Sequence, residues 1–175
     1  MNVNMNYKKY LGKRGYIIKK SFFKESELNE IRNELTVKPY VMAEYAANVE
    51  EFKIFRENKA KMYLPKCYAF NKFGEPEYSK IPVGQNIDLT FNGTLRDLQK
   101  LAVDTYVQSY TDNKNKAGGG IISLGCGQGK TVIALNIISR LKKKTLIIVH
   151  KEFLMNQWKE RISTFLPEAQ IGKIQ

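Results

Sequence analysis

The chain has 175 residues, enough for one domain or for one ordinary domain with a smaller partner. Its hydrophobic fraction of 43% and mean hydropathy of -0.41 are typical of a soluble globular protein. It contains no apolar run of roughly 18 residues and no apolar block behind the basic N-terminus, so we expect an intracellular protein with neither a membrane span nor a secretory signal. The formal net charge of +12, with an isoelectric point near 9.6, favours nucleic acid as a partner over a merely solvated basic surface.

Residues 1–92 are expected to form a small α+β accessory domain. A strand-like stretch, GYIIKKSFF, precedes a helix-like stretch, ESELNEIRNEL, and aromatic segments broken by Pro and Gly follow. Five aromatic residues alternate with lysines here, as in proteins that bind single-stranded nucleic acid, although such aromatic side chains more often form a core. They are Tyr7, Tyr10, Tyr16, Phe22 and Phe23. A non-motor nucleic-acid-binding module based on this half is therefore the alternative function.

A helix is predicted from about Thr94 to Thr111, because apolar residues recur at helical spacing through LRDLQKLAVDTYVQSY. Thr94 is placed to cap this helix, with Asp97 three residues later. A polar, turn-rich segment, TDNKNKAGGG, then leads into an apolar run, residues 121–124, which is short enough to be a buried strand.

The next stretch, SLGCGQGKT, occupies residues 123–131 and has the composition of a phosphate-binding loop. Gly125, Gly127 and Gly129 let the backbone approach an anion closely, and a helix starting near Lys130 would direct its unpaired N–H groups at the same anion. Lys130 would reach the β- and γ-phosphates, and Thr131 would place its hydroxyl on Mg²⁺. The position between an apolar run and an amphipathic segment favours this interpretation over an ordinary glycine-rich turn.

A second strand and a second helix are predicted after the loop. An apolar stripe over residues 132–141 ends in a basic cluster, residues 142–144, where the helix dipole favours positive charge. The apolar run 145–149 predicts a second buried strand, and a further helix ends before Pro167. A third strand could begin at residue 170. This strand–helix order predicts a parallel sheet covered by helices.

These residues resemble a known family. LGCGQGKT resembles motif I of superfamily 2 helicases, in the XPB-type and type III restriction-like branch, in which the leucine at position 124 is usual. GTLRDLQ, residues 93–99, is similar to the segment in which that family reads adenine, and residues 145–158 are similar to motif Ia. The resemblance implies an α/β fold, with a RecA-like P-loop parallel sheet over residues 93–175 as a partial first motor lobe.

The basic N-terminal half and the Lys-, Asn- and Ile-rich composition also resemble helicases of large cytoplasmic DNA viruses related to the poxvirus transcript-release helicase. This likeness implies a cytoplasmic location and a partner in the transcription or replication machinery.

The family resemblance implies an ATP-dependent helicase or translocase that uses ATP and Mg²⁺ on nucleic acid, with DNA favoured over RNA. Its nucleotide site would comprise Arg96, Gln99, Gly125, Cys126, Gly127, Gln128, Gly129, Lys130 and Thr131. Gln99 would read the adenine base, and Lys130 would be the catalytic residue. His150, Lys151 and Gln157 would contact the tracked strand, whereas Trp158 is more typical of core packing. His150-Lys151 departs from the Pro-Thr or Pro-Ser of many relatives, which leaves the local turn open.

The DExH or DEAD motif that orients water in this family has no counterpart here, because the sequence contains no Asp-Glu pair. We therefore expect the 175-residue chain to bind ATP without hydrolysing it alone, and its incomplete sheet to favour self-association. The two cysteines, Cys67 and Cys126, lack metal-ligand spacing and are expected to be reduced thiols. A P-loop phosphotransferase acting on a small molecule is a third reading, which the strong basic charge disfavours.

Overall fold

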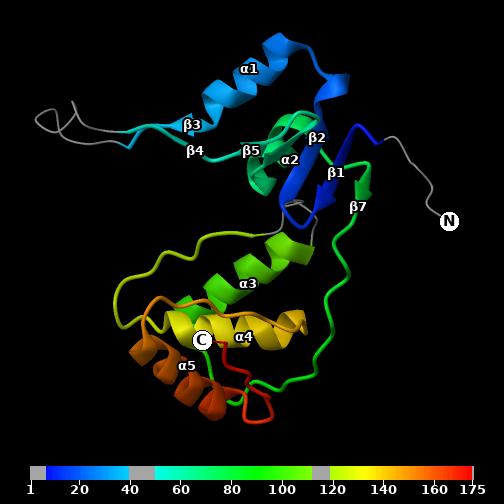
Figure 1. Ribbon diagram of the computed structural model, residues 1–175. Coiled ribbons are helices and arrows are strands. Elements are labelled where there is room, and N and C mark those ends of the chain that lie inside the picture. The colour runs from blue at the N-terminus through cyan, green and yellow to red at the C-terminus, as the bar shows by residue number, and fades with distance from the viewer. Residues whose placement is uncertain (1–6, 40–49, 112–118, 175) are drawn as a thin grey trace, which may run out of the picture. The chain divides into compact units, whose positions relative to one another are not determined.

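The computed structural model describes residues 7–39, 50–111 and 119–174 (Figure 1). The chain is of mixed α/β class and divides into two compact units, Met1–Pro82 and Val83–Gln175. We call them the N-terminal unit and the glycine-loop unit. Within the described ranges, no helix has both the length and the apolar character needed to cross a membrane.

The N-terminal unit is built on a five-stranded mixed sheet with the strand order β5-β6-β2-β1-β7. Neighbouring strands are antiparallel except for β1 and β7, which are parallel. The strands are β1 (Lys9–Gly12), β2 (Gly15–Lys19), β5 (Arg56–Glu57), β6 (Lys61–Leu64) and β7 (Tyr78–Ser79). A separate two-stranded ladder joins β3 (Thr36–Val37) to β4 (Phe52–Lys53).

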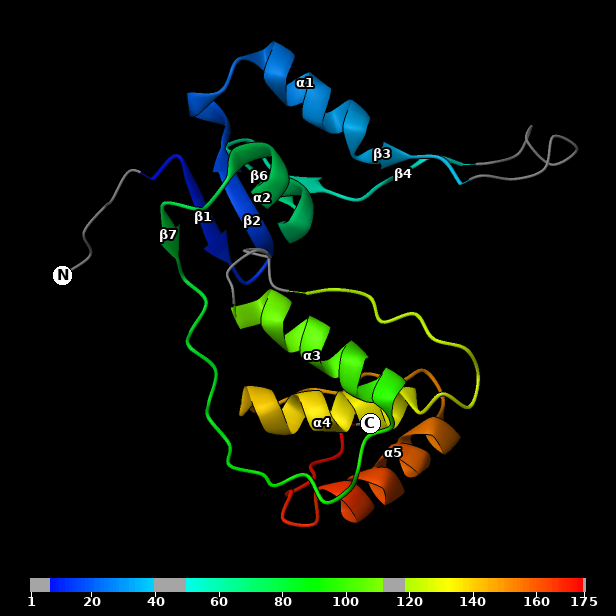
Figure 2. The ribbon, with the colours of Figure 1, turned by 180° about the vertical axis from the view of Figure 1, so that it is seen from behind.

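One face of the five-stranded sheet carries the core of this unit. Tyr16 and Ile18 of β2 pack there with Met62 of β6, and the helices supply Leu28 and Ile31. The helical elements are the 3₁₀ turn η1 (Lys20–Phe22), α1 (Glu25–Glu34) and α2 (Lys66–Phe73), drawn around the sheet in Figures 1 and 2. The predicted strand GYIIKKSFF and helix ESELNEIRNEL are thus confirmed over β2 and α1.

The aromatic residues of the N-terminal unit differ in their burial. Tyr16 is fully buried against Phe70 and Phe73, and this burial raises the pKa of its hydroxyl to about 12. Phe23 packs at the edge of the same core, whereas Phe22 is 40% exposed. Most of these rings therefore serve as core, as the commoner use of such residues predicts.

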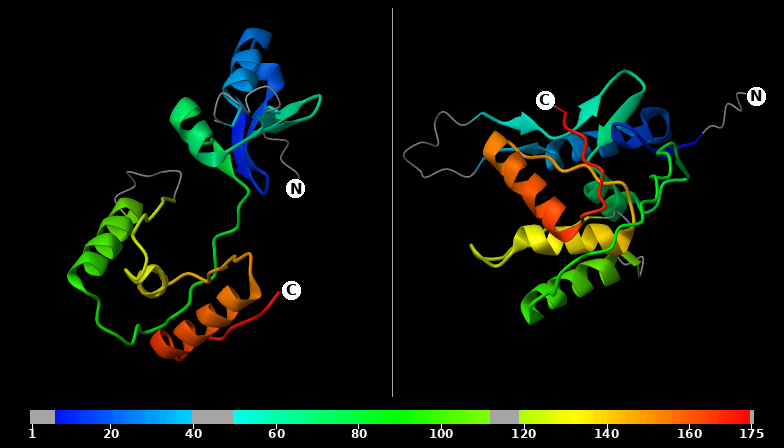
Figure 3. Two further views of the ribbon diagram at one scale, coloured as in Figure 1. Left: turned by 90° about the vertical axis from the view of Figure 1, so that its left-hand side faces the viewer. Right: turned by 90° about the horizontal axis from the view of Figure 1, so that it is seen from below.

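The glycine-loop unit contains three helices, α3 (Asp97–Thr111), α4 (Lys130–Leu141) and α5 (Glu152–Phe165). Val103 and Val107 of α3 pack against Ile133 and Ile137 of α4, and the two helices lie side by side in every view (Figures 1 to 3). All three predicted helices of this unit are present.

The start of α3 differs from the prediction. The helix begins at Asp97, so Thr94 does not cap it. Gln99, the third helical residue, instead accepts a hydrogen bond from the backbone N–H of Arg96 at 3.0 Å. In a capping box, the side chain of the third helical residue accepts a hydrogen bond from the backbone N–H of the N-cap residue, and Gln99 forms this bond with Arg96.

The buried strands predicted at 121–124 and 145–149 are not formed. In both segments alternate residues are half-buried, but no described residue pairs with either segment as a strand, and Ile121, Leu146 and Ile148 are 96%, 73% and 84% exposed. The described residues after 169 are not a strand either. Apolar character marked these segments correctly as extended, yet a strand requires a hydrogen-bonded neighbour, which the local sequence does not supply. Most of the predicted turn segment, residues 112–118, lies outside the described residues.

The basic cluster 142–144 is held by the segment 85–88. The backbone N–H of Lys144 donates to Gln85, and the ammonium group of Lys142 forms an ion pair of 2.9 Å with Asp88. Lys143 donates to the side chain of Asn86. These lysines lie at the C-terminus of α4, where the helix dipole favours cations, and their partners are residues of the segment 85–88.

Candidate nucleotide-binding site

The glycine loop takes the conformation that a tight phosphate-binding turn requires. Gly127 and Gly129 have φ angles of 73° and 79°, in the left-handed region that glycine adopts without steric cost. The helix α4 then begins at Lys130, and no acceptor in the described part of the chain pairs with the N–H groups of residues 130–132. The loop therefore presents unpaired donors at a positive helix end.

The ammonium group of Lys130 lies within the loop. It donates to the backbone oxygens of Leu124 and Gly125, at 3.0 and 2.9 Å. The side chain is exposed, so these bonds can be exchanged for bonds to an anion. One full positive charge thus adds to the partial charge of the helix end.

Two residues of α3's N-terminal end hold the loop in place. The side-chain amide of Gln99 donates to the backbone oxygen of Gln128 at 3.0 Å, and Arg96 donates to Gly127 at 3.4 Å. A Cβ atom on Gly129 would lie only 2.3 Å from the nitrogen of the Gln99 amide. Gly129 is therefore needed both for its backbone conformation and for the close approach of Gln99.

The predicted adenine contact of Gln99 stays a prediction. The amide already uses one donor and one acceptor, which leaves one N–H and one lone pair for a base edge. The side chain is 5% exposed, so little of it is accessible to a base in this structure. The sequence reasoning missed the structural role of Gln99, because no local spacing shows which backbone oxygen lies opposite a side chain.

The remaining residues of the predicted nucleotide site are accessible. Cys126 is an exposed free thiol, as expected, and Cys67 in the other unit is also free and exposed. Gln128 is exposed, and Thr131 is half-buried in the first turn of α4. Mg²⁺ bound to a nucleotide keeps several waters and phosphate oxygens as ligands, so one hydroxyl group from Thr131 fits such an ion.

The predicted nucleic-acid residues lie on and before α5, and the structure does not join them to the loop. His150, Lys151 and Gln157 are all exposed, and in the described ranges none of them forms a hydrogen bond with residues 123–131. Lys151 occupies the N-cap position of α5. Trp158 is half-buried on the same helix, which leaves its core and stacking interpretations both open.

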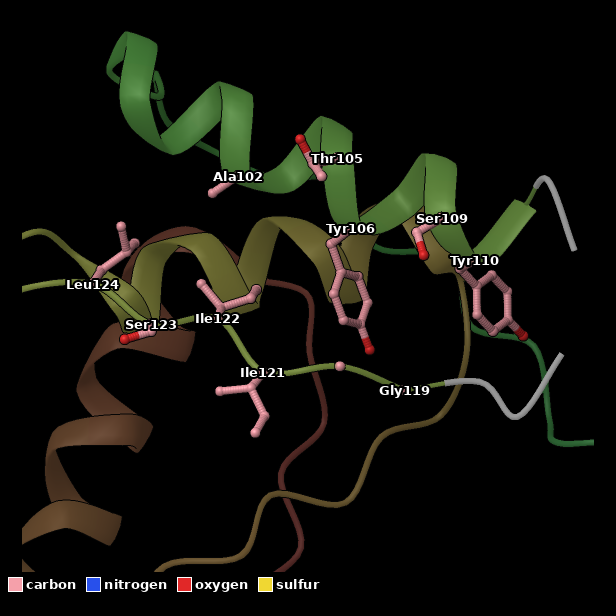
Figure 4. Close-up of a pocket in the computed structure, with 11 residues that line it drawn as sticks. Ala102, Thr105, Tyr106, Ser109, Tyr110, Gly119, Ile121, Ile122, Ser123 and Leu124 are labelled. Carbon is pink, nitrogen blue, oxygen red and sulfur yellow. The ribbon is translucent and has the colours of Figure 1, made fainter. Parts of the chain in front are cut away.

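A hollow of about 350 Å³ lies beside the loop, between α3 and the extended segment 119–124 (Figure 4). The ring of Tyr106 points from α3 toward this segment, and Tyr110 follows one turn later. The hollow begins at Gly119 and ends at Leu124, before the glycines of the loop. The hollow therefore lies along a side of the apolar segment 119–124 that other residues cover only in part. The phosphate-binding loop begins where the hollow ends.

Comparison with known proteins gives a family and several relatives for this chain. The family described as type III restriction enzyme, res subunit, matches residues 92–175. A mimivirus protein from Acanthamoeba polyphaga mimivirus, named "Putative ATP-dependent RNA helicase L396", is 35% identical over 97% of this chain.

Two further relatives match shorter parts. "Putative helicase 109L" of Invertebrate iridescent virus 3 is 40% identical over 46% of the chain, and the "DNA 3'-5' translocase XPB2" of Sulfurisphaera tokodaii is 44% identical over 41%. The matched regions span 33%, 23% and 15% of the lengths of these three relatives, in the order given.

Proposed function

Because residues 92–175 belong to the XPB-type and type III restriction-like branch of superfamily 2 helicases, we propose that the glycine loop binds the triphosphate of ATP in an ATP-dependent helicase or translocase. One observation carries this proposal: the Lys130 ammonium and the acceptor-free N–H groups of α4's first turn lie at the same loop. A triphosphate loses its hydration on binding, and donors of this kind replace the lost contacts.

The roles of the site residues follow from their positions. The backbone of Gly125, Gly127 and Gly129 surrounds the phosphates, and Lys130 exchanges its bonds with the loop oxygens for bonds to the β- and γ-phosphates. Thr131 supplies a hydroxyl ligand to Mg²⁺. An Mg²⁺ ion held there would neutralise charge on the phosphates.

Residues 93–175 form, in this proposal, part of a RecA-like lobe, and residues 1–92 form an accessory domain. The exposed apolar side chains of 121–124 and 145–149 support this view, since helices on the faces of a parallel sheet cover residues of this kind. These 175 residues contain no Asp-Glu pair of the kind that orients water in this family, so in this proposal they bind ATP without hydrolysing it alone.

Nucleic acid is the proposed macromolecular partner of the lobe, through His150, Lys151 and Gln157. Lys151 stands at the N-terminal end of α5, where a cation and free N–H groups both suit a phosphate. The names of the relatives differ on the substrate, one citing RNA and another DNA, so both are substrates to be compared.

The proposal is tested by nucleotide binding to Lys130→Ala, with Lys100→Ala as a control that removes the same charge from an exposed position on α3. With a fluorescent ATP analogue and Mg²⁺, we expect about tenfold or greater loss of affinity for Lys130→Ala, because a hydrogen bond to a charged group contributes about 1.5–3 kcal/mol. Lys100→Ala should bind as the parent chain does. Equal affinities of all three proteins would refute a phosphate site at this loop.

The adenine role of Gln99 is tested by comparing ATP with GTP. If Gln99 reads adenine, Gln99→Ala weakens ATP binding more than GTP binding. If it only holds the loop, both affinities fall by the same factor, and the adenine role is rejected.

A further inference from the structure

The N-terminal unit has a second face of its sheet, opposite the core, that carries aromatic and basic residues in register. Strand pairing places Tyr78, Tyr10, Ile17, Tyr63 and Arg56 in one row across β7, β1, β2, β6 and β5. The ammonium groups of Lys80 and Lys61 lie 5.0 and 5.7 Å from the ring centroid of Tyr10. Tyr10 and Ile17, in the middle of the row, are 6% and 5% exposed, whereas Tyr78 and Arg56 at its two ends are exposed. We call this row and its lysines the second sheet face.

Charge is segregated between the two sides of this unit. On the helix side, the carboxylates of α1 and β5 are neutralised by cations: Arg32 forms ion pairs with Glu25 and Glu57, and Lys72 forms them with Glu30 and Glu34. The hydrogen bonds to Arg32 lower the pKa of Glu57 to about 2. The acidic groups on this side therefore leave little free negative charge.

The cations near the β5–β6 edge are different. Arg14, Lys53, Arg56 and Lys66 form no ion pair with any described residue. They line a single hollow of about 360 Å³, together with Tyr63 and Ile54, and no carboxylate lies among its lining residues. Four uncompensated positive charges around one hollow favour a polyanion.

Tyr63 gives the hollow an aromatic surface next to these charges. The guanidinium of Arg14 lies over the Tyr63 ring, 5.6 Å from its centroid, and Asn58 donates to the ring hydroxyl at 3.3 Å. Both the ring and the guanidinium plane are surfaces on which an unpaired base stacks. At the far end of the row, Tyr78 is 44% exposed and stacks on Tyr7 with centroids 5.1 Å apart.

We propose that this hollow binds single-stranded nucleic acid, with phosphates on Arg14, Lys53, Arg56 and Lys66 and a base on Tyr63. A duplex hides its base faces, so it cannot use the ring. This site lies outside the glycine-loop unit and does not depend on the ATP proposal.

The test measures oligonucleotide binding by the whole 175-residue chain, using fluorescence anisotropy over a series of salt concentrations with no ATP or GTP present. Each phosphate contact to a single strand contributes about -0.7 to the slope of log K against log salt. Arg14→Gln/Arg56→Gln should therefore make the slope shallower by about 1.4. Lys24→Gln/Lys100→Gln, which removes two charges from exposed positions elsewhere, should leave the slope of the parent chain.

Stacking is tested separately from charge. Tyr63→Leu should weaken binding by about tenfold without a change in slope, within the range that stacking of one base contributes. Tyr63→Phe keeps the ring and should restore the affinity. The affinity ratio between oligo-dT and oligo-U of equal length then assigns the site to DNA or RNA, since only the 2′-hydroxyl and the base methyl differ.

Four results would each overturn the proposal: equal slopes for the arginine and lysine double variants, equal affinities for Tyr63→Leu and Tyr63→Phe, duplex binding as tight as single-strand binding, or loss of oligonucleotide affinity in Lys130→Ala. The last variant also separates the two sites. Loss of ATP binding with oligonucleotide binding retained supports both proposals, whereas ATP binding retained by Lys130→Ala counts against the nucleotide site alone.

Discussion

Replacing each of the three loop glycines by alanine should lower the stability of the chain by a different amount, because an added Cβ atom has different surroundings at each position. Gly125 lacks a positive φ angle, and an added Cβ would lie at an ordinary 3.7 Å from the Gln128 side chain. Gly127 has a φ of 73° with open space around the added atom. Gly129 combines a φ of 79° with a contact of 2.3 Å to the Gln99 amide. Stability should therefore fall in the order of these positions.

The magnitudes follow from separate physical costs. Gly125→Ala is a surface change and should lie within about 0.5 kcal/mol of the parent chain. Gly127→Ala places an L-residue in the left-handed region, which costs about 1–2 kcal/mol. Gly129→Ala adds the loss of the Gln99–Gln128 hydrogen bond, about 1 kcal/mol, so a total of about 2–3 kcal/mol is expected.

The measurement is denaturant unfolding followed by the fluorescence of Trp158, the one tryptophan of the chain, which lies on α5 in the same unit. A double-mutant cycle isolates the contact: in a Gln99→Ala background, Gly129→Ala should cost only the strain of Gly127→Ala. If Gly129→Ala is no more destabilising than Gly125→Ala, the described loop conformation is wrong. If the cycle shows no coupling, Gln99 does not hold the loop.

Two further predictions concern pH and association. The pKa of Glu57 is about 2 in the folded chain against an ordinary 4.5, so its ion pair stabilises the N-terminal unit fully above pH 4.5 and is lost as the pH falls toward 2. Far-UV circular dichroism should show a shallower loss of stability from pH 5 to 3 in Glu57→Gln, and an unchanged slope would contradict the role of the Arg32 pair. Ile121 and Ile148 are 96% and 84% exposed, so the chain should self-associate with rising concentration and Ile121→Thr/Ile148→Thr should do so less. Light scattering from a parent chain that stays monomeric would refute this.

The helices were predictable because their information is local. The stripe over residues 132–141 appears as α4, and its basic end follows the helix dipole. The left-handed C-cap at Lys142, with a φ of 51°, was not predictable, because asparagine or glycine normally marks that position. Its lysine is instead held by the segment 85–88, a contact between residues more than fifty positions apart.

The strands predicted for the glycine-loop unit are not formed in the described residues. The continuous apolar runs at 121–124 and 145–149 predicted fully buried strands, whereas the structure half-buries only alternate residues. Pairing depends on a second segment at about 4.8 Å, and no pattern within five residues specifies that partner. The N-terminal unit contains a strand that the sequence did not predict. The two-residue strand β7 pairs in parallel with β1, although its short sequence gives no strand signal.

The position of Gln99 links the two ends of the proposed nucleotide site. Its amide both closes the first turn of α3 and holds the backbone of the phosphate loop, so one side chain fixes the distance between the helix that would meet the base and the loop that would meet the phosphates. Because the Gln99 amide forms both of these hydrogen bonds, it can bind a base in two ways. It can give up at least one of the two bonds, or it can use its remaining N–H and lone pair. In the first case, adenine would loosen the loop around the phosphates and weaken their binding. The second case keeps the loop intact, so adenine recognition and phosphate binding add, and Gln99→Ala should then weaken ATP binding more than GTP binding.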